Sequence, residues 1–325
     1  MILYPDALLV LVAALILDAL VGDPDWLWRR WPHPVAWIGR LIAWGDRVLN
    51  REDRSERARR AAGALALSAV ILLALAAGWL TETALRALPV GPAWVALAAS
   101  VLLAQRSLYE HVSRVRTAFA SGGVATARRA VAMIVGRDPD SLDEAGVARA
   151  AIESTAENFS DGIVAPAFWF ALLGLPGLLA YKAANTADSM VGHLSPRHRA
   201  FGWAAARFDD LANLVPARLA GVLVALAAPA AAGRPGRALR VMWRDARLHR
   251  SPNAGWPEAA MAGALGLALG GPRLYAAGRV DEPFLHAEGR PDATPADIDR
   301  ALRILVAACC LHVALYAGVA SALRL

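Results

Sequence analysis

Residues 61–80 read Ala61-Ala-Gly-Ala-Leu-Ala-Leu-Ser-Ala-Val-Ile-Leu-Leu-Ala-Leu-Ala-Ala-Gly-Trp-Leu80, twenty consecutive residues without a charge. At about 1.5 Å per residue a helix of this length spans roughly 30 Å, the thickness of the hydrocarbon core of a bilayer. Leucine, alanine and valine dominate the run, and they do not alternate with polar residues as the strands of a membrane barrel do. The stretch therefore predicts a transmembrane helix.

Six further apolar runs extend this pattern along the chain, at residues 7–21, 93–104, 163–180, 214–232, 259–270 and 304–323. The run at 163–180 contains Gly174-Leu-Pro-Gly177, which is a turn signal. It is either a kinked span or a helical hairpin that returns to the same side of the membrane, and the hairpin is preferred. We predict an all-α, polytopic transmembrane helical bundle with a re-entrant helical hairpin, in which residues 1–325 form a single integral-membrane domain.

Composition supports a membrane protein. The 325 residues are 57% hydrophobic and 19% charged, with a mean hydropathy of +0.39. A soluble domain has about 45–50% apolar and about 25% charged residues. Disorder is excluded, since it requires low hydrophobicity. The two cysteines, Cys309 and Cys310, are adjacent, so the sequence predicts neither a disulfide framework nor a zinc site.

The distribution of arginine predicts the orientation in the membrane. Nine arginines lie in residues 24–60 and seven in residues 105–150, whereas the short connection 81–92 has only Arg86. By the positive-inside rule both long loops, at about 24–60 and 105–160, are expected in the cytoplasm. The second contains a helical insert, for which Ser141 and Glu144 form a candidate capping box. The net charge of +6 fits such loops, and no nucleic-acid partner is expected.

Five polar clusters interrupt the apolar runs, where each charge costs about 2.5–3.5 kcal/mol on insertion scales. They are Asp23 with His33; the stretch Glu153 to Asp161; the stretch Lys182 to Ser189; Arg207, Asp209 and Asp210 with Asn213 and Arg218 downstream; and the stretch Ser251 to Glu258. Structural alternatives stay open for three of them, and for Lys182 the alternative is a lysine that survives by chance at an interface. Asp209 and Asp210 would also stabilise a helix start, and Pro32-His33-Pro34 would also form a rigid turn.

Two of the clusters have the composition of a phosphate and metal site. Glu153 and Glu157 are four residues apart and share a helix face, which Asp161 would extend by one turn. Stacked carboxylates repel one another unless a cation lies between them, and magnesium prefers oxygen ligands. Lys182 is the only lysine of the chain, and its ammonium group suits a phosphate.

Together these clusters resemble the adenosylcobinamide-phosphate synthases of cobalamin biosynthesis, the CobD/CbiB family. The matching stretches are Gly22-Asp-Pro24, Trp31-Pro-His-Pro-Val35, Ile38-Gly39, Val135-Gly-Arg-Asp138, Ala151-Ile-Glu-Ser-Thr-Ala-Glu-Asn158, Asp161-Gly162, Tyr181-Lys-Ala-Ala-Asn-Thr-Ala-Asp-Ser-Met-Val-Gly192, Phe201-Gly-Trp-Ala-Ala-Ala-Arg-Phe-Asp-Asp-Leu211, Pro216-Ala-Arg-Leu219, His249-Arg-Ser-Pro-Asn-Ala-Gly-Trp-Pro-Glu258 and Gly270-Gly271. They follow one another over about three quarters of the chain. The tail at 272–325 matches weakly, and its acids have no assigned role.

The resemblance implies an amide synthase that joins a carboxylate of adenosylcobyric acid to (R)-1-amino-2-propanol or its O-phosphate, driven by ATP and Mg2+. The expected catalytic residues are Lys182, Asp209, Asp210 and Asn158. The expected nucleotide-binding residues are Glu153, Glu157, Asp161, Asp188 and Arg207, and the first four of these would also bind the metal. The expected substrate-binding residues are Asp23, His33, Asn185, Ser189, Ser251, Asn253 and Glu258.

Two other functions stay open: a corrinoid-related membrane transporter and a non-catalytic scaffold of the pathway. The broken run at Gly174 favours a transporter, since discontinuous helices are typical of transporters. The absence of an inverted repeat and the density of carboxylates and amides favour the enzyme. We expect a multi-pass protein of the bacterial cytoplasmic (inner) membrane with its site facing the cytoplasm. Its partners would be the corrinoid, the amino alcohol and the lipid bilayer, with other pathway enzymes or a second copy as further candidates.

Overall fold

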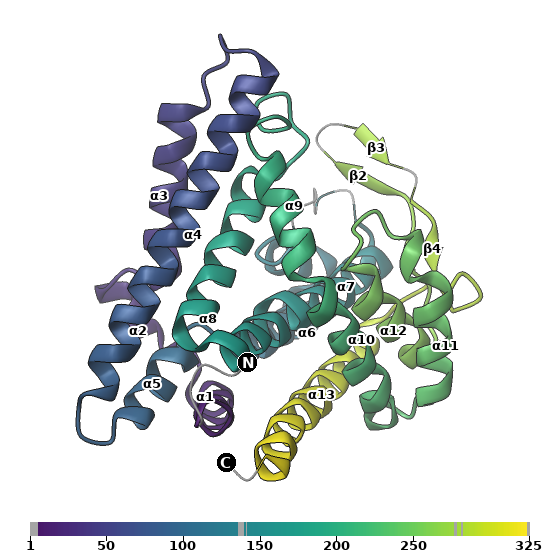
Figure 1. Cartoon of the computed structure of the whole chain (residues 1–325). Helices are drawn as coiled ribbons and strands as arrows, with labels where there is room; N and C mark the ends of the chain where they lie inside the picture. The colour runs from purple at the N-terminus through teal and green to yellow at the C-terminus, as the bar shows by residue number, and fades with distance from the viewer. Residues whose placement is uncertain (1–5, 136–139, 141, 276–277, 281, 324–325) are drawn as a thin grey trace. The chain divides into compact units, whose positions relative to one another are not determined.

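The computed structural model describes residues 6–135, 140, 142–275, 278–280 and 282–323, and it is built almost entirely from helices (Figure 1). The α-helices are α1 (Ala7–Val21), α2 (Asp25–Arg30), α3 (Pro34–Leu49), α4 (Glu56–Arg86), α5 (Gly91–Ser100), α6 (Gln105–Val131), α7 (Glu144–Phe159), α8 (Ala165–Val191), α9 (Trp203–Ala212), α10 (Leu214–Ala227), α11 (Pro235–Asp245), α12 (Gly255–Leu265) and α13 (Pro295–Ala322). The minor elements are the π-turn η1 (Ser160–Val164), the 3-10 turns η2 (Ala228–Ala231) and η3 (Ala246–Leu248), and the strands β1 (Leu269–Gly270), β2 (Arg273–Tyr275), β3 (Gly278–Val280) and β4 (Phe284–Leu285). β1 pairs with β4 and β2 with β3, both antiparallel.

Four helical segments of the described chain are long and apolar enough to cross a membrane. They are Glu56–Arg86, Glu144–Val191, Leu214–Ala231 and Pro295–Ala322, and the shorter helix Ala7–Val21 is also apolar. The prediction of an all-α transmembrane protein is therefore confirmed. The apolar run at 259–270 is not among these four segments: it falls in α12, whose 11 residues are all buried, and in β1. An apolar helix of this length is typical of a buried core rather than of a span.

The chain packs as two compact units, here called unit 1 and unit 2. Unit 1 holds residues 6–104, 165–213 and 316–323 of the described chain, and unit 2 holds residues 105–164 and 214–315. That residues 1–325 form a single integral-membrane domain stays a prediction. The core of unit 1 lies between α3, α4, α8 and α9 and includes Ile42, Leu67, Val70 and Phe201. In unit 2, α12 packs against α10 and α11.

Close packing of α4 against α8 and against the segment before α9 depends on small residues. A Cβ added at Gly63 would lie 1.9 Å from the Phe201 carbonyl oxygen, and one at Gly78 would lie 2.5 Å from the Pro176 Cα. In Figure 1 the two helices run side by side. Glycine brings the backbones together here, as it does in other transmembrane helix pairs.

Helix α8 is broken at Gly174, as the turn signal in the sequence predicts. Gly174 has φ +67° and ψ −153°, while helical geometry resumes at Leu175. A Cβ added at Gly177 would lie only 2.4 Å from the Trp169 carbonyl oxygen. Eight residues of a straight helix would separate these positions by about 12 Å. The chain therefore turns back sharply at Gly174, while the side of the membrane from which the two halves enter stays a prediction.

Replacement of Gly174 by alanine is expected to destabilise the protein by more than the 1–3 kcal/mol that backbone strain costs. The conformation of Gly174 is nearly exclusive to glycine, and an added Cβ would lie 2.3 Å from Glu82 Oε2. Gly123→Ala is the matched control, since Gly123 has φ +65° and ψ −162° but nothing within 4 Å of an added Cβ. Thermal unfolding in detergent measures both variants. Equal losses would show that contact with Glu82 adds nothing.

Candidate functional site

A buried carboxylate and three polar partners link α8 to α9 in unit 1. Asp209 Oδ1 accepts a hydrogen bond from Asn185 Nδ2 at 3.3 Å, and Asp209 Oδ2 accepts one from Asn213 Nδ2 at 3.0 Å. The Tyr181 hydroxyl donates to Asn213 Oδ1 at 3.0 Å. We call Tyr181, Asn185, Asp209 and Asn213 the Asp209 network. Two clusters that are separate in the sequence thus come together at one carboxylate, which is 8% exposed.

The surroundings of Asp209 disfavour its charge. Burial raises the pKa of Asp209 to about 7, and the nearby carboxylates of Asp188 and Asp210 add to the rise. The hydrogen bonds from Asn185 and Asn213 act in the opposite direction. Asp209 therefore exchanges a proton near neutral pH, which is the range that a general base requires.

The side chain of Asp210 lies in a different environment from that of Asp209. Arg207 Nη1 lies 3.3 Å from Asp210 Oδ2, and the Arg207 side chain is 67% exposed. Burial raises the pKa of Asp210 above its ordinary value, and the charge of Arg207 partly offsets this. The structure thus distinguishes two neighbouring carboxylates that the sequence treats alike. The reading of the pair as a simple helix start is wrong, because α9 begins at Trp203.

The other predicted residues of α8 lie near this network along the helix. Lys182 and Asp188 are half-buried, and Ser189 is exposed. The Lys182 carbonyl accepts a hydrogen bond from the Thr186 hydroxyl at 2.6 Å. Gly192 follows Asp188 so closely that an added Cβ would lie 1.9 Å from Asp188 Oδ1. Unit 1 therefore presents carboxylates, amides and one ammonium group within two adjacent helices.

The stability of the metal-free protein is expected to fall as pH rises from about 4 to 7. In the unfolded chain Asp209 would lose its proton near its ordinary pKa of 3.8, whereas in the folded chain it holds the proton to about pH 7. Stability is lost wherever the folded state binds more protons, so the cost is absent below the lower value and complete above the higher one. Unfolding temperatures of wild type and Asp209→Asn across pH 5–8, without magnesium, measure this. A parallel pH dependence in the two proteins would contradict it.

Asp23 and His33 make structural contacts in unit 1. His33 is the N-cap of α3: its Nδ1 accepts from Val35 N at 3.2 Å, and Nε2–H donates to the Val101 carbonyl at 3.0 Å. Trp28 Nε1 donates to Asp23 Oδ1 at 3.2 Å. These bonds favour the rigid-turn interpretation of the histidine. Substrate binding by the two residues stays a prediction.

Glu153, Glu157 and Asp161 lie in unit 2 and have three different environments. Glu153 is 4% exposed, and its Oε1 accepts from Gly270 N at 2.6 Å, so it holds β1 against α7. Glu157 is exposed, and Asp161 lies half-buried on the π-turn η1. A π-turn has more residues per turn than an α-helix, so the angle between Glu157 and Asp161 differs from that in a regular α-helix. A single face shared by the three carboxylates stays a prediction.

Asn158 belongs to a hydrogen-bonded group on α7. Its Nδ2 donates to the Ser154 carbonyl at 2.9 Å and to Ser154 Oγ at 3.0 Å. Ser154 Oγ in turn donates to the Ile134 carbonyl at 2.7 Å. The Asn158 amide is thus oriented from within its own helix. Its catalytic role stays a prediction.

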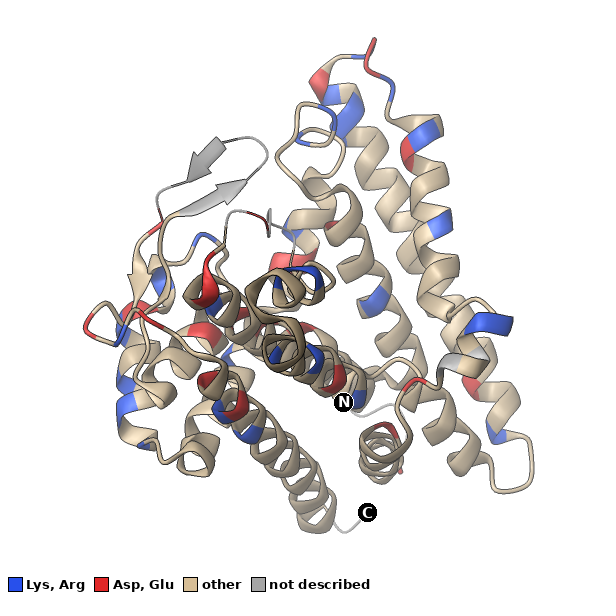
Figure 2. Ribbon diagram, turned by 180° about the vertical axis from the view of Figure 1, so that it is seen from behind, with Lys and Arg blue, Asp and Glu red and all other residues tan. Residues whose placement is uncertain are grey.

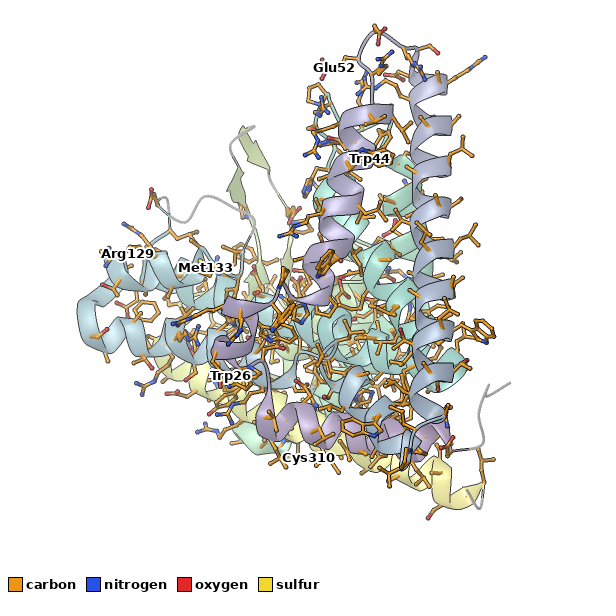
Figure 3. All side chains as sticks on the ribbon, turned by 90° about the vertical axis from the view of Figure 1, so that its left-hand side faces the viewer. Trp26, Trp44, Glu52, Arg129, Met133 and Cys310 are labelled. Carbon is orange, nitrogen blue, oxygen red and sulfur yellow. The ribbon has the colours of Figure 1, made fainter. Side chains whose placement is uncertain are left out.

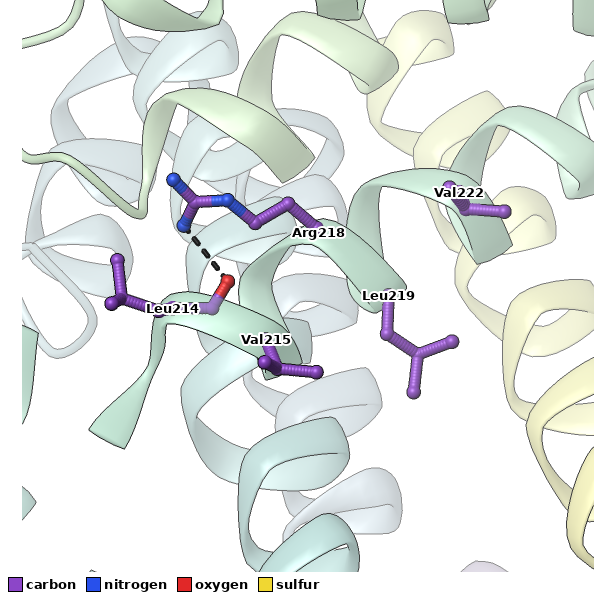
Figure 4. A pocket seen from close by; sticks show the side chains of 5 residues that line it. All are labelled: Leu214, Val215, Arg218, Leu219 and Val222. Carbon is purple, nitrogen blue, oxygen red and sulfur yellow. Dashed lines mark hydrogen bonds between the residues drawn. The ribbon is translucent and has the colours of Figure 1, made fainter. Parts of the chain in front are cut away.

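The Ser251 cluster surrounds an arginine in unit 2. Arg218 Nη1 donates to Asn253 Oδ1 at 2.8 Å and to the Leu214 carbonyl at 2.9 Å, and its guanidinium lies 4.5 Å from the Trp256 ring centre. Figure 4 shows Arg218 extending to the Leu214 carbonyl; a pocket is lined by Arg218 with Leu214, Val215, Leu219 and Val222. The sequence places Arg218 in the fourth polar cluster, but it assigns this arginine no role.

Ser251 and His249 make further contacts in this cluster. Ser251 Oγ accepts from Asn253 N and Ala254 N, both at 3.2 Å, just before α12 begins. His249 Nε2 lies 3.7 Å from Glu258 Oε1, and Glu258 is 1% exposed. Ser251 thus shapes the turn into α12. Substrate binding by Ser251, Asn253 and Glu258 stays a prediction.

The carboxylate oxygens of unit 1 are the kind of ligand that magnesium binds. Within the ranges that the structure describes, no three His, Cys, Asp or Glu side chains form a group that could hold a metal. Magnesium bound with a substrate phosphate needs only one or two protein carboxylates. The repulsion between Asp188 and Asp209 is of the kind that a divalent cation relieves. Binding of one ion by Glu153, Glu157, Asp161 and Asp188 together stays a prediction.

The predicted cap of α7 differs from the observed one, and some predicted residues lie outside the described chain. Asp143, not Ser141, caps α7, because Asp143 Oδ1 accepts from Gly146 N at 2.7 Å. Ser141 and the Gly-Arg-Asp part of Val135-Gly-Arg-Asp138 lie outside the described chain. In the tail Asp297 has a structural role, since its Oδ2 accepts from Thr294 N and Oγ1 at the start of α13.

Sequence reasoning missed one buried ion pair in unit 1. Glu82 on α4 is fully buried; its Oε1 accepts from Arg86 Nε and its Oε2 from Leu175 N, both at 2.9 Å. Arg86 also bonds both carboxylate oxygens of Asp6 at 3.0 Å. Glu82 therefore satisfies the first free N–H group after the break at Gly174. The four-residue spacing of Glu82 and Arg86 was the available signal.

Comparison with known proteins gives a consistent result over nearly the whole chain. Residues 11–305 match the family model described as CobD/Cbib protein, so the match continues into the tail. Cobalamin biosynthesis protein CobD of Sinorhizobium sp is 53% identical over 307 residues, which are 93% of this chain and 94% of the relative. The protein of the same name from Rhizobium meliloti (strain 1021) is 49% identical over 323 residues, 98% of this chain and 99% of the relative. That of Rhodobacter capsulatus is 50% identical over 302 residues, 91% of each. No solved structure matches.

Proposed function

The chain belongs to the CobD/CbiB family, and from this premise we propose that it works in cobalamin biosynthesis as an ATP-dependent amide synthase. Its substrates would be a carboxylate of adenosylcobyric acid and (R)-1-amino-2-propanol or its O-phosphate. The product is adenosylcobinamide or its phosphate. The reaction belongs at the cytoplasmic face of the bacterial inner membrane, where the soluble substrates are found.

The reaction has two chemical requirements. A carboxylate does not react with an amine until one of its oxygens becomes a leaving group, and bound ATP with magnesium supplies that activation. The amine, which is an ammonium ion at neutral pH, must lose a proton before it attacks. The new C–N bond then forms as the C–O bond to phosphate breaks. Positioning and charge neutralisation account for most of the rate in such transfers.

The observation that carries this proposal is the buried Asp209 network. Asp209 is held from both sides by Asn185 and Asn213, and its pKa of about 7 suits it to accept the proton of the amine. Lys182 and Arg207 would neutralise phosphate charge, and Asn158, Asn185 and Asn253 would orient the substrates. Asp188 has the chemistry of a magnesium ligand in unit 1, and Glu153, Glu157 and Asp161 are the candidates in unit 2.

Product formation by purified protein in detergent tests the reaction. The assay contains adenosylcobyric acid, ATP and magnesium, with aminopropanol or its phosphate in parallel, and the corrinoid products are identified by mass. A product that carries the added amide arm, and that requires both ATP and magnesium, is the expected result. No product with either amine, from folded protein that binds the corrinoid, would contradict the proposal.

Transport is the second candidate function, because α8 is broken within an apolar segment. Uptake of labelled corrinoid into sealed vesicles distinguishes it from the enzyme. ATP-dependent synthesis in detergent needs no sealed compartment, whereas transport does. A protein with neither activity would fit a scaffold.

A further inference from the structure

Unit 1 carries an apolar groove between α3 and α4, with a volume of about 720 Å³. Twenty described residues line it, and among them Arg54 is the one that carries a charge. We call this cavity the α3–α4 groove. It is separate from the Asp209 network, none of whose members lines it.

Small side chains produce the groove. Gly45 on α3 faces Ala66 on α4, and a Cβ added at Gly45 would still lie 3.9 Å from the Ala66 Cβ. Ala187, Val191 and Phe201 also line the groove and belong to the buried core of unit 1. The two helices therefore leave a trough above a well-packed base.

The rim of the groove is apolar and exposed. Leu65 and Leu73 on α4 are 71% and 57% exposed, and Trp44 on α3 is 54% exposed. In water such side chains would be costly, whereas the hydrocarbon of a bilayer accommodates them. Since α4 is a candidate membrane span, these residues are suited to contact lipid.

The length of the groove matches one leaflet. Its α4 residues run from Ala58 to Leu73, which is roughly 22 Å of helix at 1.5 Å per residue. The hydrocarbon core is about 30 Å thick, so one leaflet contributes roughly 15 Å and the headgroup region several more. The groove begins beside the charged loop after α3 and extends into the uncharged run at 61–80. A phospholipid of one leaflet, with its acyl chain and headgroup, has about the length of this groove.

The charged end of the groove favours a phosphate. Figure 2 shows acidic and basic residues gathered where α3 and α4 join. Glu52 and Glu56 there form ion pairs with Arg197 and Arg199, while Asp53 is the third acid of the loop. These pairs reduce the negative charge around Arg54. In Figure 3, Trp44 on α3 lies below Glu52 of the following loop. Tryptophan side chains commonly lie at the headgroup level of a membrane.

We propose that the α3–α4 groove binds a single phospholipid, with an acyl chain along the groove and its phosphate at Arg54. A cation at the mouth of an otherwise uncharged trough complements a phosphate ester. A helix from a second copy of the chain would gain nothing from that arginine. The volume lies within the range of about 300–1,000 Å³ that small-molecule sites occupy. This site does not depend on the proposed reaction.

Native mass spectrometry of protein purified in mild detergent tests the acyl-chain part of the site. Gly45→Leu places a side chain in the trough and is expected to lower the fraction of protein carrying one phospholipid at least tenfold. Gly45→Ala is the matched control, since its Cβ has room, and it is expected to retain the lipid. Ala69→Leu, on the exposed side of the groove, is a second filling variant if the first fails to fold. Equal lipid occupancy in wild type and a folded filling variant would overturn the proposal.

The headgroup part has its own control. Arg54→Gln is expected to weaken retention of phospholipid severalfold under increasing collision energy, whereas Arg51→Gln, which removes an exposed arginine outside the groove, is expected to leave it unchanged. If the two variants weakened phospholipid retention equally, Arg54 would act only through the general positive charge of the surface. That result would overturn its role as the phosphate-binding residue. A lipid-free dimer in wild type that Gly45→Leu converts to a monomer would identify a second copy as the occupant.

Discussion

Replacement of Asp209 by asparagine is expected to lower the rate of amide formation about 10²–10⁴-fold, the usual contribution of a general base. Asparagine preserves the size of the side chain, and its one amide oxygen can still accept from Asn185 or from Asn213. It cannot take a proton from the amine. The mass-resolved assay described above measures the rate. Corrinoid binding is expected to remain, because the variant keeps the fold of α8 and α9.

Asp210→Asn is the matched control for this prediction. The two residues are neighbours on α9, but Asp210 pairs with the exposed Arg207 and lies outside the Asp209 network. We expect its replacement to lower the rate less than tenfold. If Asp209→Asn kept full turnover while Asp210→Asn lost it, the roles of the two carboxylates would be reversed. If both kept full turnover, neither would be the base.

Replacement of Glu82 by alanine is expected to cost about 3–5 kcal/mol of stability, the usual effect of breaking a buried ion pair. The Glu82 side chain is fully buried, and the charge of Arg86 would lose this partner while keeping its pair with Asp6. The N–H of Leu175 would also lose its acceptor at the break in α8. Thermal and denaturant unfolding in detergent measure the loss.

Glu110→Ala provides the matched comparison. Glu110 on α6 also pairs with an arginine four residues away, Arg106, but its side chain is 40% exposed. Exposed pairs of this kind contribute at most about 1 kcal/mol. Glu82→Gln is expected to lie between the two, because its amide oxygen can still accept from Leu175. Equal losses for Glu82→Ala and Glu110→Ala would contradict the structural role of the buried pair.

Several features of the fold could be predicted because their signals are local. The uncharged run at 61–80 lies within α4, and Gly174-Leu-Pro-Gly177 marks the break in α8. Both depend on residues within one or two turns of each other. The run at 259–270 could not be assigned, because an apolar segment of twelve residues looks alike in a core and in a membrane. In the structure its helical part, α12, is buried on all sides in unit 2.

For the candidate site, too, local features could be predicted from the sequence and long-range contacts could not. Residue types and their order predicted which polar clusters carry chemistry and which family the chain resembles. They could not predict that Asp209 meets Asn185, 24 residues earlier, or that Glu153 bonds to Gly270, 117 residues later. They also could not predict the π-turn that follows Phe159, on which Asp161 lies.

By itself the sequence determined that this is a helical membrane protein of the CobD/CbiB type, because hydrophobic length and ordered motifs are properties of the linear chain. The tertiary structure alone decided which of two adjacent aspartates is buried, which glutamate caps the broken helix, and where α3 and α4 leave a groove. These outcomes depend on helices that approach one another across many residues. Burial and distance, which set the charge state of a carboxylate and the room for a ligand, exist only after that packing.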